Sequence, residues 1–390
     1  MAWALTPLTE EQRAIQSTAR EFAQRELAPF VDEWDRDAKF EPAIIPKLAE
    51  LGFLGMLVPE QFDGLGLDTL TYLVALEEIA AVDASAAVLM SVHNSLPTQM
   101  ILRWGTDAQK QQFLKPMARG ELLGAFALSE PDSGSDAAAL GTQATRDGDG
   151  WVLNGTKAWV SGGTHAGVVL VMARTDSADD RKGARGIGAF IVTPDLAGYA
   201  VGKKEDKMGL RASPTVSLRF DNMRVPAGNL LGEPAMGFIY AMQSLDAGRL
   251  GIAAQAVGIA QAALSHASKY AAERRQFGKP IKEFQAIQFR LADMATRVAS
   301  SRALLHAAAT ARDRGQHVTQ WCAMAKLMAS EAAMWVTTQA IQIFGGYGYV
   351  KEYPLERLFR DAKVTEIYEG TSEIQRIVIA RELYPHGAGL

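Results

Sequence analysis

Near its centre the chain reads Trp151-Val152-Leu153-Asn154-Gly155-Thr156-Lys157-Ala158-Trp159-Val160. Asn154-Gly155 between two apolar runs predicts a β-hairpin, because this dipeptide favours the tight turn that joins paired strands. Clusters of Gly, Pro and Asp separate further strand-like runs, at residues 168–173, 187–193 and 215–220. Short strands at this spacing predict a small β-barrel or sandwich domain over residues 126–237.

The sequence on either side of this region has the pattern of helices. Residues 1–125 open with Thr9-Glu10-Glu11-Gln12, which has capping-box spacing, and apolar residues then recur every three to four positions. Residues 238–390 contain long Ala- and Leu-rich runs, and three of them are predicted to end at Gly278, Gly315 and Gly345. A fourth helix is expected to begin near Thr371. The fold is therefore expected to be mainly α, with an N-terminal helical domain, a middle β domain and a C-terminal four-helix bundle.

Composition argues against several classes of protein. The 390 residues carry a net charge of -4 and one cysteine, Cys322. This charge does not suggest a nucleic-acid partner, and a single cysteine excludes a disulfide framework and makes a Cys-rich metal site implausible. The N-terminus has no signal-peptide pattern. The longest uncharged stretch, residues 250–268, contains Gln, Ser and His, which indicates a buried bundle helix and no membrane span. We expect a cytoplasmic protein without a bound metal.

A polar segment joins the first helical region to the β region. It reads Phe126-Ala127-Leu128-Ser129-Glu130-Pro131-Asp132-Ser133-Gly134-Ser135-Asp136, and its hydroxyl and backbone N–H groups suit the edge of a polar ligand. The plainer interpretation is a connection that caps the next element. Trp159 and Ser161 lie two apart on one predicted strand and so share a face, where they suit a planar heterocycle. A half-buried aromatic residue on a sheet surface is the alternative.

Two predicted helix ends contain residues suited to a phosphate ligand. Arg274-Arg275-Gln276-Phe277-Gly278 offers two guanidinium groups for a pyrophosphate, although cations at a helix C-terminus also offset its dipole. Gln342-Ile343-Phe344-Gly345-Gly346 permits close approach of the backbone, although glycines also cap helices. The sequence contains neither GxGxxG nor GxxxxGK[ST], so it predicts neither a Rossmann nor a P-loop nucleotide site.

The last candidate segment reads Thr365-Glu366-Ile367-Tyr368-Glu369-Gly370-Thr371-Ser372-Glu373. Its plainer interpretation is that Glu369 is an exposed acid favoured by the positive end of the following helix. The alternative is a general base. Burial in an apolar pocket would raise the pKa of Glu369 towards the working pH, as that role requires.

These segments together resemble the acyl-CoA dehydrogenase family over essentially the whole chain. The matching motifs are Ala127-Leu128-Ser129-Glu130-x-x-Ser133-Gly134-Ser135-Asp136, Arg274-x-x-Phe277-Gly278, Gln342-x-x-Gly345-Gly346 and Ile367-Tyr368-Glu369-Gly370-Thr371. Each motif is modest alone, but all four in this order and at this spacing are specific. Within the family, the chain most resembles the short-chain, butyryl-CoA type.

The resemblance implies a cofactor, an assembly and roles for single residues. FAD is expected to lie extended between the middle and C-terminal domains and to reach a neighbouring subunit of a homotetramer, a dimer of dimers. The residues implied to contact FAD are Phe126, Leu128, Ser129, Trp159, Ser161, Arg274, Phe277, Gln285, Gln342, Gly345, Gly346, Thr371 and Glu373. Those from Arg274 to Gly346 would hold the pyrophosphate and adenosine of a neighbour's FAD. The residues implied to contact acyl-CoA are Ser135, Asp246, Arg249, Tyr368 and Gly370.

The resemblance also implies the reaction. Glu369 would remove the α-proton of a short-chain acyl-CoA while flavin N5 accepts the β-hydride, giving a trans-2-enoyl-CoA. An FAD ribityl hydroxyl and the Glu369 N–H would donate hydrogen bonds to the thioester oxygen and stabilise the developing enolate. Electron-transfer flavoprotein is the implied electron acceptor, and fatty acid β-oxidation is the implied pathway.

One position bears on where the base lies. Some family members carry the catalytic Glu on the first bundle helix, directly before an Arg; here Gly248 precedes Arg249, so the base is expected at Glu369 and the isovaleryl type is disfavoured. Isobutyryl-CoA and 2-methylbutyryl-CoA stay open as substrates.

The rivals within the family are an acyl-CoA oxidase, a glutaryl-type decarboxylating enzyme and a DNA-associated flavoprotein of the same fold. The glutaryl type needs a cation in the acyl pocket, and no obvious Arg lies beside Val92 and Leu96, although Arg103 is close in sequence. The DNA-associated type is expected to have a basic surface and a C-terminal extension, and the net charge of -4 disfavours it.

Overall fold

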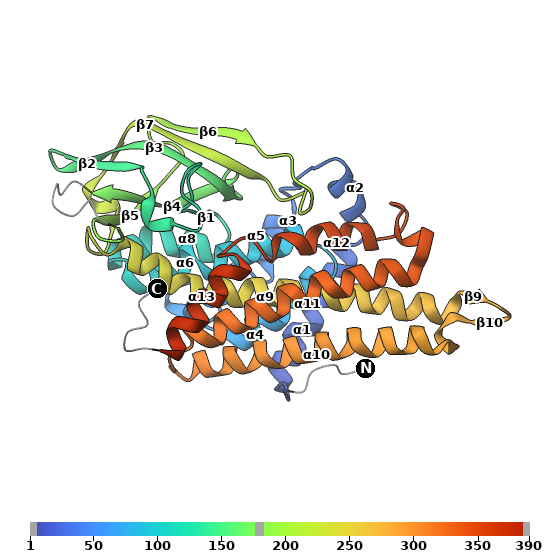
Figure 1. The fold of residues 1–390 in the computed structure, drawn as a ribbon. Helices are drawn as coiled ribbons and strands as arrows, with labels where there is room; N and C mark the ends of the chain where they lie inside the picture. Colours follow the sequence, from blue (N-terminus) through green and yellow to red (C-terminus); the bar gives the residue numbers. More distant parts are fainter. Residues whose placement is uncertain (1–5, 176–182, 385–390) are drawn as a thin grey trace.

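The computed structural model describes residues 6–175 and 183–384, in which helices come first along the chain, strands second and helices again last. The long C-terminal helices lie side by side, the N-terminal helices pack along them, and the sheet lies over one end of the helical layer (Figure 1). The expected order of helical, β and helical regions is confirmed.

The N-terminal helices follow from local sequence signals. They are α1 (Glu10–Phe22), α2 (Val31–Arg36), α3 (Ile44–Glu50), α4 (Thr69–Ala80), α5 (Ala84–Ser95), α6 (Pro97–Trp104), α7 (Asp107–Gln109) and α8 (Lys115–Ala118). The predicted capping box at the start of α1 is present: the Gln12 N–H donates to Thr9 Oγ1 at 3.1 Å, and the Thr9 N–H donates to Gln12 Oε1 at 3.0 Å. Residues that satisfy the free N–H groups of the first turn therefore determine where this helix begins.

The middle region forms one mixed sheet. Its strands are β1 (Leu123–Ala127), β2 (Gln143–Asp147), β3 (Gly150–Ser161), β4 (Ala166–Thr175), β5 (Ile187–Val192), β6 (Tyr199–Lys204), β7 (Thr215–Val225) and β8 (Leu230–Leu231). The strand order is β6-β7-β3-β2-β4-β5-β8, and β1 pairs with β4 in parallel. The sheet has an apolar core of its own, in which the Trp151 and Phe190 rings pack edge to face with centroids 5.4 Å apart. The predicted runs at 168–173, 187–193 and 215–220 correspond to β4, β5 and β7.

The predicted hairpin turn at Asn154-Gly155 is wrong. Strand β3 continues through these residues, and its pairing with β7 shifts register between Leu153 and Gly155. A side chain at Gly155 would lie 2.5 Å from Thr142 Oγ1, so glycine is required here by a close approach within the sheet. Pairing along the whole length of β7 therefore outweighs the local turn signal, which is absorbed as a bulge.

The C-terminal region contains long helices and a small hairpin. Its elements are α9 (Gly237–Glu273), β9 (Arg275–Gln276), β10 (Lys279–Pro280), α10 (Gln285–Asp313), α11 (Thr319–Phe344), α12 (Leu355–Val364) and α13 (Ser372–Leu383). Helices α9, α10, α11 and α13 are the four that the sequence predicts, but the predicted end of the first at Gly278 is wrong: α9 ends at Glu273, and Gly278 lies in the turn of the β9–β10 hairpin. Helix α12 was not predicted, although its buried Leu355, Leu358 and Ala362 have helical spacing. It packs on α9 and α11 and brings the chain to the loop before α13.

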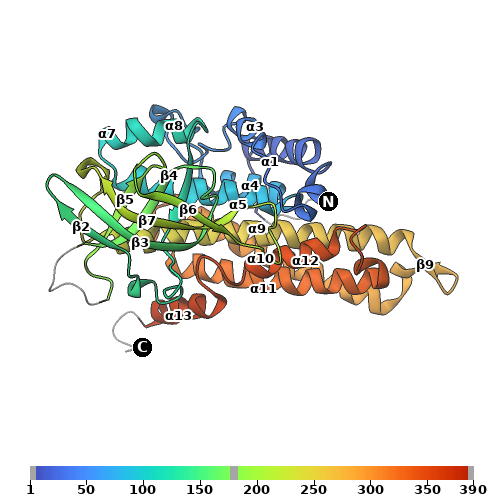
Figure 2. The same ribbon diagram turned by 90° about the horizontal axis from the view of Figure 1, so that it is seen from above.

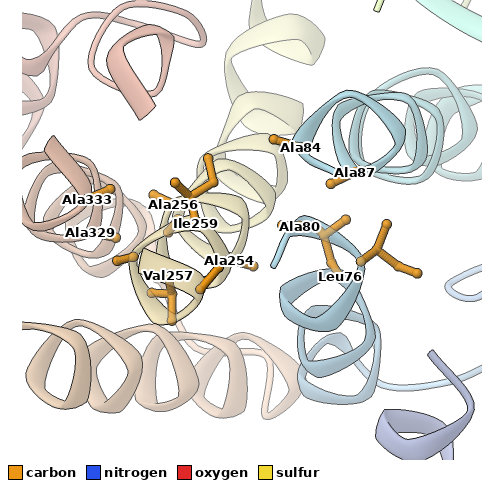
Figure 3. Packing of buried hydrophobic residues seen from close by; sticks show 14 of the residues in the cluster. Leu76, Ala80, Ala84, Ala87, Ala254, Ala256, Val257, Ile259, Ala329 and Ala333 are labelled. Atoms are coloured by element: carbon orange, nitrogen blue, oxygen red, sulfur yellow. The ribbon is translucent and has the colours of Figure 1, made fainter. Parts of the chain in front are cut away.

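Helix α9 is the central element of the helical core. Its small apolar residues lie between α4 and α5 on one side and α11 on the other, so the helices approach closely (Figure 3). The helix is long and apolar enough to cross a membrane, but 83% of its most apolar window is buried within the protein. Its apolar surface is therefore used in packing, as predicted for residues 250–268. Cys322 on α11 is also buried.

Candidate active site

Glu369 lies in the loop between α12 and α13, and its carboxylate faces α9. A side chain built at Gly248 would place its Cβ 1.9 Å from Glu369 Oε2, so glycine at this position makes room for the carboxylate. Glu369 is partly exposed as a residue, but both carboxylate oxygens are buried and accept no hydrogen bond from the described residues. Burial raises the pKa of Glu369 to about 7, although Lys326 and Arg249 act in the opposite direction. A carboxylate in this state is suited to accept a proton near neutral pH.

Two consecutive residues of this loop have left-handed backbone. Glu369 has a φ of 52° and Gly370 a φ of 91°, and the first of these is unfavourable for a residue with a side chain. Buried side chains hold the loop: Lys326 Nζ donates to the Gly370 carbonyl at 2.7 Å, and Gln375 Nε2 donates to the same carbonyl at 2.8 Å. Gln375 Nε2 also lies 3.2 Å from the Glu369 carbonyl oxygen. Lys326 and Gln375 were not predicted as site residues; a lysine within the Ala-rich α11 is the sequence signal that could have identified Lys326.

The facing side of α9 carries a buried ion pair. Arg249 Nη1 lies 2.7 Å from Asp246 Oδ1, and Thr319 Oγ1 donates to Asp246 Oδ2 at 2.7 Å. Arg249 is 5% exposed, and its Nε has no hydrogen-bond partner among the described residues. The predicted substrate residues Asp246 and Arg249 therefore lie together beside Gly248, with one buried donor still free.

A second polar contact joins the loop to α9. The Tyr368 hydroxyl donates to Gln255 Oε1, and Gln255 Nε2 donates to the Ala84 carbonyl at 2.7 Å. Gln255 is fully buried and follows Gly248 by seven residues, so both lie on one face of α9. The Tyr72 hydroxyl from α4 is buried nearby, 3.4 Å from a Cβ built at Gly251. The face of α9 that Glu369 approaches therefore has Gly248 beside the carboxylate and, two helical turns later, the hydrogen-bonded Gln255.

The segment after β1 is fixed by a buried lysine. Lys157 Nζ on β3 is 0% exposed; it donates to the Leu128 carbonyl at 3.0 Å and to Glu130 Oε1 at 2.7 Å. Glu130 in turn accepts hydrogen bonds from the N–H groups of Gly141, at 2.6 Å, and Thr142, at 2.9 Å. These contacts tie both ends of the segment to the sheet. Glu130 and Lys157 were not predicted as site residues.

The predicted ligand residues of this segment differ in exposure. Phe126 and Ser129 are partly buried, Leu128 is buried and Ser135 is exposed. Ser129 is anchored by its carbonyl, which accepts a hydrogen bond from the Ala158 N–H at 2.9 Å. The Ser129 hydroxyl is therefore carried on rigid backbone beside β3.

Trp159 projects from an irregularity in β3. Its φ is 61°, the pairing with β7 shifts register between Lys157 and Val160, and the indole is 63% exposed. Val160 is buried, whereas Ser161 is partly exposed. An exposed ring on strained backbone is a feature that folding alone does not explain, and it suits stacking against a planar ligand.

The first turn of α13 has further polar groups. Thr371 caps the helix, because its Oγ1 accepts from the Ile374 N–H at 3.3 Å. The Ser372 hydroxyl is buried and has no partner among the described residues. Glu373 is exposed in the same turn. The predicted residues Thr371 and Glu373 therefore lie directly after Glu369, at a helix start that favours a polar ligand.

The remaining predicted cofactor residues lie at the other end of the long helices. A hollow of about 790 Å³ is lined by residues of α9, α11 and the turn after α11, among them Arg274, Gly345 and Gly346. Gln342 is exposed in the last turn of α11, and Gln285 is exposed at the start of α10. A side chain at Gly345 or Gly346 would meet no atom within 4 Å, so the backbone there is open to a ligand.

Phe277 lies at the tip of the β9–β10 hairpin. Phe277 and Gly278 have φ values of 48° and 83°, as a two-residue hairpin turn requires, and the Phe277 ring is 92% exposed. Figure 2 shows this hairpin at the opposite end of the molecule from the sheet that carries Trp159. Arg249 lies on α9 and Arg274 directly follows its last residue, so the 25 residues between them correspond to about 37 Å along the helix. One chain therefore does not bring the two sets of predicted FAD residues together.

No cluster of His, Cys, Asp and Glu suited to a metal ion occurs within residues 6–175 and 183–384. The functional groups of the candidate site are a carboxylate, buried cations, hydroxyls and an exposed indole.

Comparison with known families covers most of the chain. Three family models match: the acyl-CoA dehydrogenase N-terminal domain at residues 9–121, its middle domain at 125–223 and its C-terminal domain at 235–384. The domain boundaries that the sequence predicts, after residue 125 and after residue 237, stay a prediction. Strand β1 begins at Leu123, just before the first of these boundaries.

Individual relatives agree with the family models. The mouse (Mus musculus) mitochondrial short-chain specific acyl-CoA dehydrogenase is 52% identical over 376 residues, which cover 96% of this chain and 90% of that protein. Butyryl-CoA dehydrogenase from Megasphaera elsdenii has the same fold, with a TM-score of 0.95, 45% identity and coverage of 97% and 99%. A chain in a structure of the electron transferring flavoprotein of Acidaminococcus fermentans gives a TM-score of 0.95 at 46% identity, with the same coverage. A Mycobacterium smegmatis glutaryl-CoA dehydrogenase in complex with FADH2 gives 0.92 at 32% identity and coverage of 98% and 97%.

Proposed function

Because this chain belongs to the acyl-CoA dehydrogenase family, which is FAD-dependent, we propose that it oxidises a short, straight-chain acyl-CoA such as butyryl-CoA. The observation that carries the proposal is the buried, unpaired carboxylate of Glu369 facing Gly248. The product is the trans-2-enoyl-CoA.

Glu369 is the general base of the proposed reaction. Its carboxylate oxygens accept no hydrogen bond from the described residues, so they are free to take the α-proton of a bound acyl group. Its pKa of about 7 means that the carboxylate is ionised at slightly alkaline pH and yet basic enough to accept a proton. Gly248 leaves the space that the carboxylate occupies.

The Glu369 main chain supplies the second element of catalysis. Within the described residues, no acceptor takes a hydrogen bond from the Glu369 N–H. This donor is available to the thioester oxygen, where negative charge develops as the α-proton leaves. The base and the oxyanion donor then belong to one residue, so the conformation of the loop determines both positions.

The residues present fit FAD. Trp159 is exposed, the buried hydroxyl of Ser372 has no hydrogen-bond partner among residues 6–175 and 183–384, and the backbone at Gly345 and Gly346 is open. Trp159, Ser129 and Ser161 would hold the flavin ring, with Thr371 nearby. FAD supplies the two-electron acceptor for the β-carbon.

We propose that Arg274 and Phe277 serve the FAD of a second copy of the chain. Arg274, directly after α9, is too far from Arg249 for one bound FAD to use both ends of the helix, and the Phe277 ring stays largely exposed although it meets the Phe284 ring edge to face. A homotetramer, a dimer of dimers, meets this requirement. Sedimentation analysis of the holoenzyme tests it.

The positions of Gln255 and Tyr368 support the proposed preference for a short acyl chain. Gln255 lies two helical turns from Gly248, about 10 Å, and its buried amide is fixed by hydrogen bonds to Tyr368 and to the Ala84 carbonyl. A longer acyl chain would have to displace these polar contacts without replacing them, which is unfavourable. Branched short acyl groups, isobutyryl and 2-methylbutyryl, are the competing candidates.

Electron-transfer flavoprotein is the proposed electron acceptor, since a chain of this fold occurs in a structure of such a protein from Acidaminococcus fermentans. Reoxidation of the reduced enzyme by purified electron-transfer flavoprotein, compared with oxygen, tests this and distinguishes a dehydrogenase from an oxidase. The cytoplasmic location expected from the sequence stays a prediction, and cell fractionation tests it.

Anaerobic titration with butyryl-CoA tests the proposed substrate. We expect bleaching of the oxidised-flavin absorbance with about one equivalent of butyryl-CoA per active site, and little bleaching with long-chain acyl-CoA, because a long chain would have to displace the hydrogen-bonded amide of Gln255. A protein that stays oxidised with butyryl-CoA and is bleached by isobutyryl- or 2-methylbutyryl-CoA contradicts the straight-chain assignment.

Arg274→Ala is expected to weaken retention of FAD by about tenfold or more, because a charge-assisted hydrogen bond contributes roughly 1.5–3 kcal/mol. The measurement is the ratio of FAD to protein after serial dilution and gel filtration. Arg314→Ala is the matched control, since Arg314 follows the C-terminus of α10, outside the hollow that Arg274 lines. Equal flavin content in both variants would contradict a role for Arg274 in binding FAD.

A further inference from the structure

Lys326 is a buried cation that neither donates nor accepts a proton in the proposed reaction. It lies on α11 and is 0% exposed, yet its hydrogen bond goes to a neutral acceptor, the Gly370 carbonyl, at 2.7 Å. Burial of an ammonium group away from water is costly unless charges or dipoles compensate. A methionine or leucine would fill this position in an Ala-rich helix at lower cost, so the ammonium has a function that packing does not explain.

The Gly370 carbonyl is the point at which Lys326 acts on the loop. This carbonyl follows the two left-handed residues Glu369 and Gly370, and it receives hydrogen bonds from both Lys326 Nζ and Gln375 Nε2. Because Glu369 is strained in this conformation, the loop needs such anchors to stay in it. Release of the carbonyl would let the backbone of residue 369 return to an unstrained region, and both its carboxylate and its N–H would move.

Lys326 also interacts electrostatically with Glu369. Glu369 is the anion that most raises the pKa of Lys326, and Lys326 is the cation that most lowers the pKa of Glu369. The surrounding charged groups are Arg249 on α9, Glu366 in the same loop and Glu373 on α13; the neutral Tyr72 hydroxyl faces from α4. Burial lowers the pKa of Lys326 to about 8, so the side chain is mainly charged at neutral pH.

We propose that Lys326 is a positioning residue for the base: its ammonium anchors the Gly370 carbonyl, keeps the Glu369 carboxylate aimed at Gly248 and supplies a buried positive charge to the same loop. This inference rests on Glu369 being the base. It assigns to one buried cation on α11 the geometry of the loop and the charge state of the proton acceptor.

The test is the pH profile of kcat/KM for Lys326→Met, which removes the ammonium and keeps the length of the side chain. In the wild type we expect activity to rise with pH through about 7, as Glu369 ionises. Without the neighbouring cation the carboxylate is harder to ionise, so this rise moves to higher pH by about one to three units. At the plateau, kcat falls roughly tenfold or more, because the base is no longer held in place.

Three variants separate charge, geometry and general damage. Lys326→Arg keeps the charge, and we expect the pH profile to stay close to the wild type. Gln375→Leu removes the neutral donor to the same carbonyl, so kcat falls while the rise stays near its wild-type pH. Thr337→Val deletes another buried polar group of α11, whose hydroxyl donates to the Ala333 carbonyl, and we expect it to alter neither quantity.

The outcomes distinguish this inference from the proposed function. A wild-type profile and kcat in Lys326→Met, with Glu369→Gln inactive, overturns the role of Lys326 and leaves the base assigned. An active Glu369→Gln overturns the proposed function itself. If Lys326→Met does not melt cooperatively or retain FAD, Lys326→Gln is measured instead; it keeps a neutral donor and lacks the charge, so its profile must also move to higher pH.

Discussion

We expect Glu369→Gln to lower the rate of flavin reduction by acyl-CoA about 10²–10⁴-fold, while the variant still binds FAD and substrate. Glutamine has the same shape as glutamate but cannot accept a proton, and the three atoms nearest to a Cβ built at Gly248 all belong to the Glu369 carboxylate. The loss therefore falls on the reductive half-reaction and not on affinity. Stopped-flow measurement of flavin reduction, with substrate binding measured separately by calorimetry, checks the prediction.

The same substitution, which lowers activity, is not expected to lower stability at alkaline pH. Burial raises the pKa of Glu369 from 4.5 to about 7, so the fold favours the protonated carboxyl, and the ionised form above this pH destabilises the protein. A pKa difference of this size corresponds to a destabilisation of the folded protein by at most about 3 kcal/mol. Glu369→Gln regains less stability than this, because Lys326 loses its anionic neighbour. We expect the Tm of Glu369→Gln at pH 8 to be at least as high as that of the wild type. Below the unfolded pKa, near pH 4, this advantage disappears.

Glu331→Gln is the control for this pair of measurements. Glu331 lies on α11 at the surface and pairs with Arg376, so the variant should reduce flavin at the wild-type rate. Near-normal turnover in Glu369→Gln would remove Glu369 from the role of base, whatever its effect on stability.

Gly248→Ala is expected to lower kcat by about 100-fold with little loss of stability. The added Cβ would lie 1.9 Å from Glu369 Oε2, which is the end of a side chain and not backbone, so the carboxylate moves and the fold does not. Alanine also favours a helix interior over glycine by about 1 kcal/mol. The expected result is a stable, yellow protein whose base is out of position.

Gly258→Ala on the same helix is the matched contrast. Its Cβ would lie 2.4 Å from the Glu77 carbonyl oxygen, so here the conflict is with the backbone of α4. We expect Gly258→Ala to lower Tm while the folded fraction keeps near-normal kcat. Wild-type kcat in Gly248→Ala would show that the carboxylate of Glu369 does not need the space beside α9.

The sequence alone predicted much of the fold, because the signals concerned are local. The capping box at Thr9 and the glycines after α10 and α11 satisfy or end a helix through atoms a few residues away. The resemblance to the acyl-CoA dehydrogenase family, carried by four motifs, is confirmed by the matched family models. One of these motifs, Ile367-Tyr368-Glu369-Gly370-Thr371, also indicates Glu369 as the candidate base.

Tertiary structure decided what local signals could not. Asn154-Gly155 has the strongest turn signal in the β region, yet pairing with β7 makes it a bulge within a strand. Whether Glu369 is an exposed acid or a buried base depends on α9, more than a hundred residues earlier, where Gly248 leaves space and the solvent is excluded. The role inferred for Lys326 likewise depends on a contact 44 residues along the chain. The sequence specifies which chemical groups are present. Burial and the distances between remote segments determine the protonation state and orientation of these groups, because the electrostatic free energy of a group depends on what surrounds it.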